Sequence, residues 1–316
     1  MQKIVSLENH IDKIRELVCE PRRSNALVKN TINWHQLCSC MDTLGDTESA
    51  ICFYEEACFP EGGGKYIYIY GLLQVMVAQQ NSVNDILVAL DFSKISWKDE
   101  PSLFKIRDLR NRSIGHPTKT DKTPIVASHF ISRPSLTKDG FQLMICEKGN
   151  SRFENVNIKE LIATQREELS KKMSEIIKKL QEDDKTHKNK YAKEKLESIF
   201  ERYGYCISKI FEAIGDEDTH CIATISLNEI NDTLNIFMNK LKERGLEYNS
   251  VADIYNKIAY PLKELEMYFS VTHGINSETA YIFTTFINCK VKELKDIAIE
   301  IDNEYSEILK NKTQKK

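Results

Sequence analysis

The segment IRDLRNRSIGHPT, at residues 106–118, brings together side chains that could act on a phosphate. Its candidate residues are Arg107, Arg110, Asn111, Arg112 and His116. A guanidinium group offers planar, paired donors that match phosphate oxygens, and an imidazole can exchange a proton near neutral pH. RNA supplies its own nucleophile, the 2′-hydroxyl, so arginine and histidine suffice in principle to cleave it without a metal. The segment therefore predicts a site for RNA.

The positive charge of this segment is local. The whole chain has a formal net charge of −3 and a pI near 6.2, which excludes the general basic character of many nucleic-acid binders. Six basic and two acidic side chains nevertheless lie between residues 105 and 122. RNA affinity would thus depend on a small patch, in which we expect Arg107, Arg112 and Lys119 to contact the substrate.

The candidate residues are expected at the end of a helix. A Pro-Ser pair at the head and a glycine at the tail predict that residues 101–115 are helical. Pro117 disfavours helical backbone at His116, so the helix should end by Gly115. The break would free the imidazole to fold back toward the helix or to meet groups from another chain.

The fold class predicted around this helix is mainly α. Apolar residues at spacings of three and four favour amphipathic helices, whereas two β-rich runs that close on Asp139-Gly140 favour a hairpin. A strand is the alternative for YIYIY, at residues 66–70. The expected elements are helices over about 4–18, 28–58, 65–92, 101–115 and 158–182, a break near 20–25, and a β-hairpin over about 124–147.

A polar segment divides the chain into two expected domains. The length of 316 residues favours two domains, and QEDDKTHKNK, at 181–190, is uniformly polar. We expect an N-terminal helical domain over 1–182, a linker over 183–190, and a C-terminal domain of about four helices over 191–316. Pro261 is expected to kink or split the third of these helices.

Other patterns argue against a metal, a cofactor or a membrane span. The cysteines near residue 40 include no C-x2-C pair, and GGGK at 62–65 lacks the spacing of a phosphate-binding loop. No run of 18 apolar residues occurs. Nine cysteines without a secretory signal indicate reduced thiols, so a cytoplasmic protein with no metal or cofactor is expected.

The string RNRSIGH, at residues 110–116, resembles the R-x4–6-H motif of the HEPN superfamily, in which a polar residue commonly follows the arginine. Asn111 occupies that place here. The segment YGLLQVMVAQQNSVNDIL, at 70–87, is similar in character to the long helix that often precedes the motif helix. The resemblance covers roughly the first 182 residues, with the β-hairpin as an embellishment. It implies that Arg110 and His116 are catalytic and that Asn111 positions them.

The resemblance implies two classes of function. Many HEPN proteins are metal-independent endoribonucleases that act as toxins, antiviral effectors or RNA-processing factors, usually as dimers whose two motifs face a shared cleft. Others have lost catalysis and serve as binding or scaffolding modules. We therefore expect a homodimer that cleaves RNA, a role in toxin systems or phage defence being implied by the family alone. The alternative is a non-catalytic module that dimerises or binds RNA or protein.

The residues themselves leave further interpretations open. Arg107, Arg110 and Asn111 could simply cap their own helix and pair with acidic residues of the bundle, in which case Gly-His-Pro is only a turn. The C-terminal helical domain could dock a partner protein, or it could sense a ligand in a regulatory subunit. A neutral pI favours these alternatives, because phosphate neutralisation contributes much of the affinity for RNA.

Overall fold

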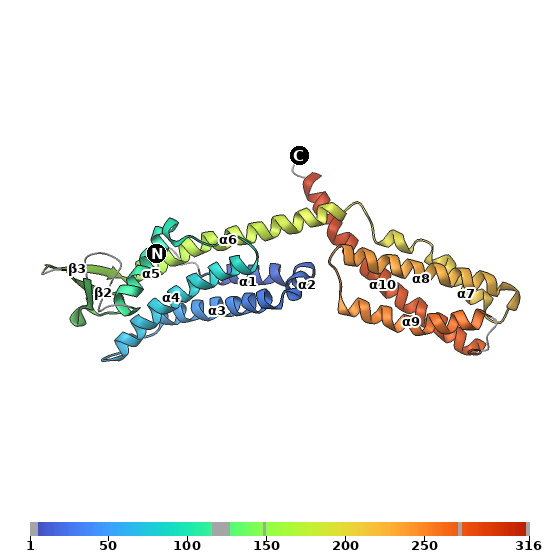
Figure 1. The fold of residues 1–316 in the computed structure, drawn as a ribbon, viewed down its shortest axis with the longest axis horizontal. Coiled ribbons are helices and arrows are strands. Elements are labelled where there is room, and N and C mark those ends of the chain that lie inside the picture. The colour runs from blue at the N-terminus through green and yellow to red at the C-terminus, as the bar shows by residue number, and fades with distance from the viewer. Residues whose placement is uncertain (1–5, 116–126, 148–149, 271–273, 314–316) are drawn as a thin grey trace. The chain divides into compact units, whose positions relative to one another are not determined.

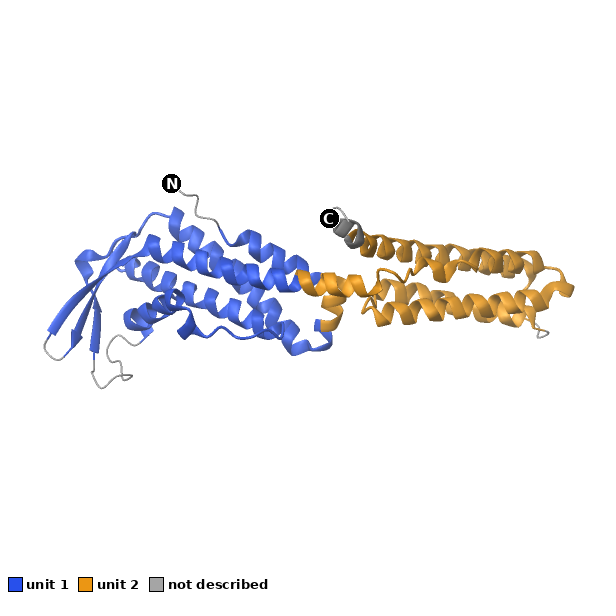
Figure 2. Ribbon diagram, turned by 90° about the horizontal axis from the view of Figure 1, so that it is seen from above, with its two compact units in different colours: residues 1–19, 27–180 blue, residues 20–26, 181–316 orange. Residues whose placement is uncertain are grey.

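The computed structural model describes residues 6–115, 127–147, 150–270 and 274–313. The chain is mainly helical with one small antiparallel sheet, as predicted (Figure 1). It forms two compact units, coloured separately in Figure 2: the first holds residues 1–19 and 27–180, and the second holds 20–26 and 181–316. Among the described helices, none combines the length and the apolar character that crossing a bilayer requires.

Five of the described helices build most of the first unit. They are α1 (Glu8–Cys19), α3 (Thr31–Glu56), α4 (Gly64–Ala89), α5 (Pro101–Arg110) and the first part of α6 (Ile158–Tyr191). Apolar residues at helical spacing face the core; in α6 these are Leu169, Met173, Ile176 and Leu180, all buried as expected. The YIYIY segment lies in the first turns of α4, so the strand alternative was wrong, because buried residues continue at helical spacing from Ile69 onward.

The expected break over residues 20–25 is confined to Glu20, between the end of α1 at Cys19 and the start of the next helix. Residues 21–25 belong to that short helix, α2 (Pro21–Lys29), in which the proline occupies the first helical position. A proline there loses no helical hydrogen bond, since the first amide groups of a helix have no partner within it. The expected interruption was therefore a helix start.

The sheet consists of β1 (Ala127–Ile131), β2 (Gly140–Glu147) and β3 (Asn150–Asn157), paired antiparallel in that order. The expected hairpin corresponds to β1 and β2, whereas β3 was not anticipated, because most of its residues are polar and exposed. One face of the sheet packs on α3, α4, α5 and α6 through Phe141, Leu143 and Val156. This packing fixes the sheet beside the helix that carries the candidate site.

The second unit is a bundle of α7 (Tyr203–Ala213), α8 (His220–Glu243), α9 (Asn249–Phe269) and α10 (Ser277–Thr313), with a short 3-10 turn between α7 and α8. Its core is apolar, with Phe200 and Phe237 in edge-to-face contact at 5.1 Å. Helix α9 continues through Pro261, so the helix is not split. Apolar residues on both sides of the proline, Ile258 and Leu265, are fully buried.

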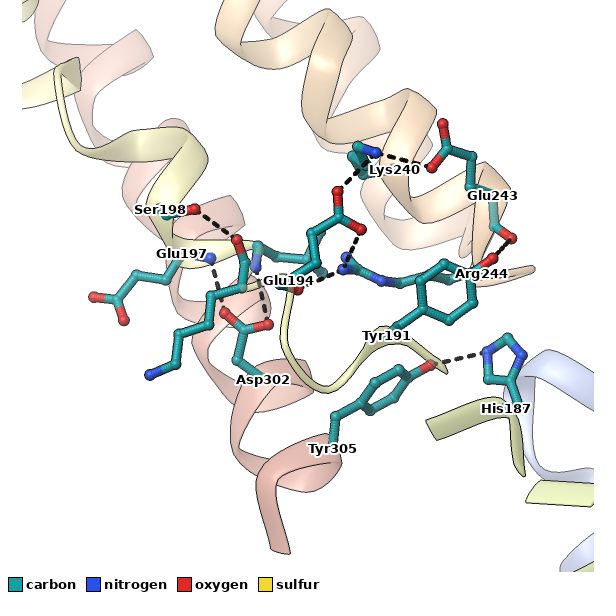
Figure 3. A network of polar contacts seen from close by, with 12 residues as sticks. His187, Tyr191, Glu194, Glu197, Ser198, Lys240, Glu243, Arg244, Asp302 and Tyr305 are labelled. Carbon is teal, nitrogen blue, oxygen red and sulfur yellow. Dashed lines mark hydrogen bonds and ion pairs between the residues drawn. The ribbon is translucent and has the colours of Figure 1, made fainter. Parts of the chain in front are cut away.

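The residues expected to form the linker are helical. Helix α6 continues to Tyr191, and an ion pair one turn apart, between Lys188 and Asp184, stabilises this stretch. Polar contacts then hold the chain where α6 ends (Figure 3). The carboxylate of Asp302 accepts hydrogen bonds from two successive amide groups, and the Nη2 atom of Arg244 donates to the Glu194 carbonyl oxygen at 2.6 Å.

Candidate functional site at the end of helix α5

Helix α5 carries the candidate residues and is fixed by one apolar face. Its buried residues, Leu103, Ile106 and Leu109, recur every three residues and face the core of the first unit. After Arg110 the backbone widens into a π-helical turn over Asn111–Gly115 instead of continuing as the expected α-helix. Such turns are uncommon and occur frequently at functional sites.

Arg110 folds back along this turn. Its Nη1 atom donates a hydrogen bond to Oδ1 of Asn111 at 2.9 Å. A Cβ atom placed on Gly115 would lie 3.1 Å from the same Nη1, so the guanidinium lies against the backbone that leads to His116. The structure thus brings Arg110 and Asn111 together beside Gly115.

The guanidinium of Arg110 has no carboxylate partner among the described residues. The side chain is half-buried, and its Nε atom is buried without a hydrogen-bond partner in the described part of the chain. Donors that are partly desolvated and not neutralised interact strongly with an anion, because the local dielectric constant is below that of water. Arg110 therefore has the chemical character that a phosphate site requires.

Arg112 has the opposite environment. Its Nε lies 2.7 Å from an oxygen of Asp108 and its Nη1 lies 2.8 Å from an oxygen of Glu154, with 15% of the side chain exposed. The hydrogen bond from Arg112 lowers the pKa of Glu154, so the pair stays ionised. These contacts tie the turn to strand β3, and Arg112 faces carboxylates where a substrate contact was expected.

Arg107 also has protein partners. Its Nη1 atom donates to Oδ1 of Asn81 at 2.8 Å and to Oε1 of Gln80 at 3.4 Å. Its Cζ atom lies 4.4 Å from the ring centre of Trp97, a cation–π contact. Burial, and then the neighbouring Arg110, lowers the pKa of Arg107. This arginine anchors α5 to α4.

His116 and Lys119, the other two predicted site residues, lie outside the described residues. Of the three residues predicted to be catalytic, the structure therefore describes Arg110 and Asn111. A polar cavity of about 210 Å³ opens nearby, between α5, β3 and the start of α6. Its polar lining residues include Ser102, Lys105, Asn155, Asn157 and Thr164. They offer hydrogen-bond donors and acceptors beside the Arg112–Glu154 pair.

A buried polar chain behind α5 was not anticipated. In its centre, Gln165 donates to Oε1 of Gln79 at 3.0 Å and accepts from Gln80 at 2.8 Å, and all three are fully buried. Gln79 donates in turn to the carboxylate of Glu48, which pairs with Arg166 at 2.9 Å. The contact of Gln80 with Arg107 extends the chain to α5. The only available signal was a pair of glutamines inside an apolar helix.

Comparison of the chain with known proteins gives no information about this site. No family model, no curated protein and no solved structure matches the chain. Within the described residues, no group of three or more histidine, cysteine, aspartate and glutamate side chains is arranged to hold a metal ion. The candidate chemistry therefore rests on the motif residues themselves.

Proposed function

We propose that the chain is a metal-independent endoribonuclease of HEPN type that acts as a homodimer, with the two motifs contributing to one cleft. The 2′-oxygen of a ribose attacks the adjacent phosphorus, the 5′-oxygen leaves, and the products are a 2′,3′-cyclic phosphate and a 5′-hydroxyl. His116 transfers the proton, Arg110 stabilises the charge on the phosphorane oxygens, and Asn111 orients Arg110.

The observation that carries the proposal is the state of Arg110. Its guanidinium is held by the neutral amide of Asn111, is not paired with a carboxylate of the described residues, and lies against Gly115. Arg112, two residues away, has two carboxylate partners. The contrast favours Arg110 as the arginine reserved for an external anion.

The alternative is a non-catalytic module of the same type that binds RNA or a protein. Arg107 and Arg112, the two arginines expected to contact the substrate, have partners within the first unit. With Lys105 left as the exposed cation of α5, phosphate contacts would be few and affinity would be modest. In this case Arg110 binds the phosphate but takes no part in catalysis.

The test is incubation of the purified full chain with mixed RNA in excess EDTA. Wild-type protein should release fragments that end in 2′,3′-cyclic phosphate. Arg110→Ala should slow cleavage about 10²–10³-fold and His116→Ala about 10²–10⁴-fold. His35→Ala, which changes an exposed histidine of α3, is the matched control and should cleave like the wild type. Equal rates for all four proteins would indicate a contaminant and refute the proposal.

A further inference from the structure

The outer face of the sheet carries an unusual pair of exposed aromatic residues. Phe130 of β1 and Phe153 of β3 are 56% and 58% exposed. Both pair with Met144 of the central strand, so the three side chains form one row across the sheet. Side chains at paired positions of neighbouring strands lie on the same face. We call Phe130, Met144 and Phe153 the aromatic row.

Packing of the sheet does not require this row. The alternate residues, including Phe141, Leu143 and Val156, are buried on the opposite face against the helices. A sheet with one buried face normally presents polar residues to water on the other. Two large rings left in water therefore indicate a surface that binds something flat and apolar.

The surroundings of the aromatic row suit nucleobases. On one side Cys146 and Ser151 are paired across β2 and β3, and on the other the Gln142 amide donates to Asn155 at 3.0 Å. These groups can hydrogen-bond base edges, and the described positions on this face carry no carboxylate that would repel a phosphate. An exposed cation, Arg133, lies just after β1.

The spacing of the rings also fits a single strand. Two strand intervals separate Phe130 from Phe153, which places their backbones about 10 Å apart. Bases of a continuous stack are only about 3.4 Å apart, so the two rings match bases splayed out along an unpaired strand. Met144 fills the space between them, and its flexible thioether adapts to either base.

The row is connected to the candidate catalytic turn. Glu154, the residue after Phe153, points to the opposite face of β3 and holds Arg112 of the turn. We propose, on the basis of the proposed function, that the aromatic row binds single-stranded RNA by base stacking on the sheet to which the Arg110 turn is tied through Arg112 and Glu154. The sheet thereby selects unpaired regions of RNA as the substrate.

The test measures binding separately from cleavage. Full-length protein with Arg110→Ala is titrated into a fluorescein-labelled, single-stranded RNA 12-mer of mixed sequence, and anisotropy is recorded at constant salt. Replacing Phe130 and Phe153 with leucine keeps apolar surface and removes both rings, so affinity should fall about tenfold or more. Replacement of both with tryptophan should preserve or raise affinity. A perfect duplex of the same sequence should bind more weakly than the single strand.

Matched controls separate stacking from other causes. Tyr205→Leu removes an aromatic ring that is 60% exposed in the second unit, and it should leave the affinity unchanged. Unchanged affinity of the leucine double variant, or no binding of single-stranded RNA at all, would overturn the inference. A surface that binds protein would tolerate leucine, so undiminished RNA affinity with leucine counts against base stacking.

Cleavage by protein with an intact Arg110 distinguishes the two proposals. If the proposed function is right and the inference is right, the leucine double variant raises KM with little change in kcat. If RNA binding depends on the rings but wild-type protein never cleaves, the nuclease proposal fails and the stacking surface stands. If cleavage occurs with the same KM in both proteins, the surface fails and the nuclease proposal stands.

Discussion

Arg166 and Arg244 are both buried arginines, one in each unit, and their surroundings differ. The Nε of Arg166 lies 2.9 Å from an oxygen of Glu48, and its Nη1 lies 2.8 Å from an oxygen of Glu55. Arg244 is 1% exposed, yet its Nε and Nη1 atoms lack hydrogen-bond partners among the described residues. A buried charge with all its hydrogen bonds made fixes one arrangement of its neighbours, whereas an incompletely paired one carries an uncompensated cost.

The difference shows in which unit buried polar contacts fix the position of a helix. The Arg166–Glu48 pair continues through three buried glutamines to Arg107, and thus to the helix that bears Arg110. The cost of burying these polar groups is offset only if each one has its partner, which leaves α5 little freedom to shift. The second unit has an apolar core whose packing gives stability without specifying the position of a site.

The largest expected effect comes from breaking the pair in the first unit. Arg166→Met leaves the Glu48 carboxylate buried and unpaired, so the free energy of unfolding of this unit should fall by about 3–5 kcal/mol. The only two tryptophans of the chain, Trp34 and Trp97, lie in this unit, so tryptophan fluorescence during urea denaturation reports on it alone. An unchanged unfolding midpoint would show that Glu48 finds other partners.

A double variant is the control for that experiment. Glu48→Gln combined with Arg166→Met removes both charges and keeps an acceptor for the neighbouring groups that bond to Glu48. It should lose less stability than Arg166→Met alone, because no ion then remains buried. A double variant that is equally unstable would assign the loss to packing.

Much of the fold could be predicted from the sequence because helical periodicity is a local signal. The helical spacing of apolar residues predicted α6, and the long apolar segment predicted α4. Strand β3 was not, because Val156 is its single buried residue and the aromatic Phe153 faces solvent. A strand whose side chains are mostly exposed lacks the alternation by which strands are recognised.

In the candidate site, contacts between sequence neighbours could be predicted, whereas contacts between distant residues could not. The nearness of Arg110 and Asn111 follows from adjacency in the sequence, so it could be anticipated. The ion pair between Arg112 and Glu154 could not be anticipated, because the two residues are 42 apart in the sequence and Glu154 lies on the unanticipated strand β3. The contact of Gln80 with Gln165, 85 residues apart, likewise depends on the tertiary fold.

A smaller effect is expected when Arg244, the buried arginine of the second unit, is replaced. Arg244→Met keeps an unbranched side chain on the Tyr191 ring and removes the incompletely paired charge. The hydrogen bonds that are lost go to the carbonyl oxygen of Glu194 and, at 3.5 Å, to its carboxylate, and Glu194 is an exposed residue that water can reach. The second unit should therefore lose about 1 kcal/mol, measured by hydrogen exchange of amides in α8 and α10. A loss as large as that of Arg166→Met would contradict the distinction drawn between the units.

The smallest effect is a dependence of the second unit on pH. Burial, then the nearby Arg22, lowers the pKa of His187 from 6.5 to about 4, although Asp184 and Asp183 oppose the shift. The unfolded chain therefore binds the proton first, so stability is complete above about pH 6.5 and declines as the pH falls toward 4. Hydrogen exchange of the α10 amides at pH 7 and pH 5, corrected for intrinsic rates, should show weaker protection at pH 5. In His187→Phe, which keeps a ring beside Tyr191 and Tyr305, this difference should shrink. An undiminished difference in that variant would assign the pH dependence to another group.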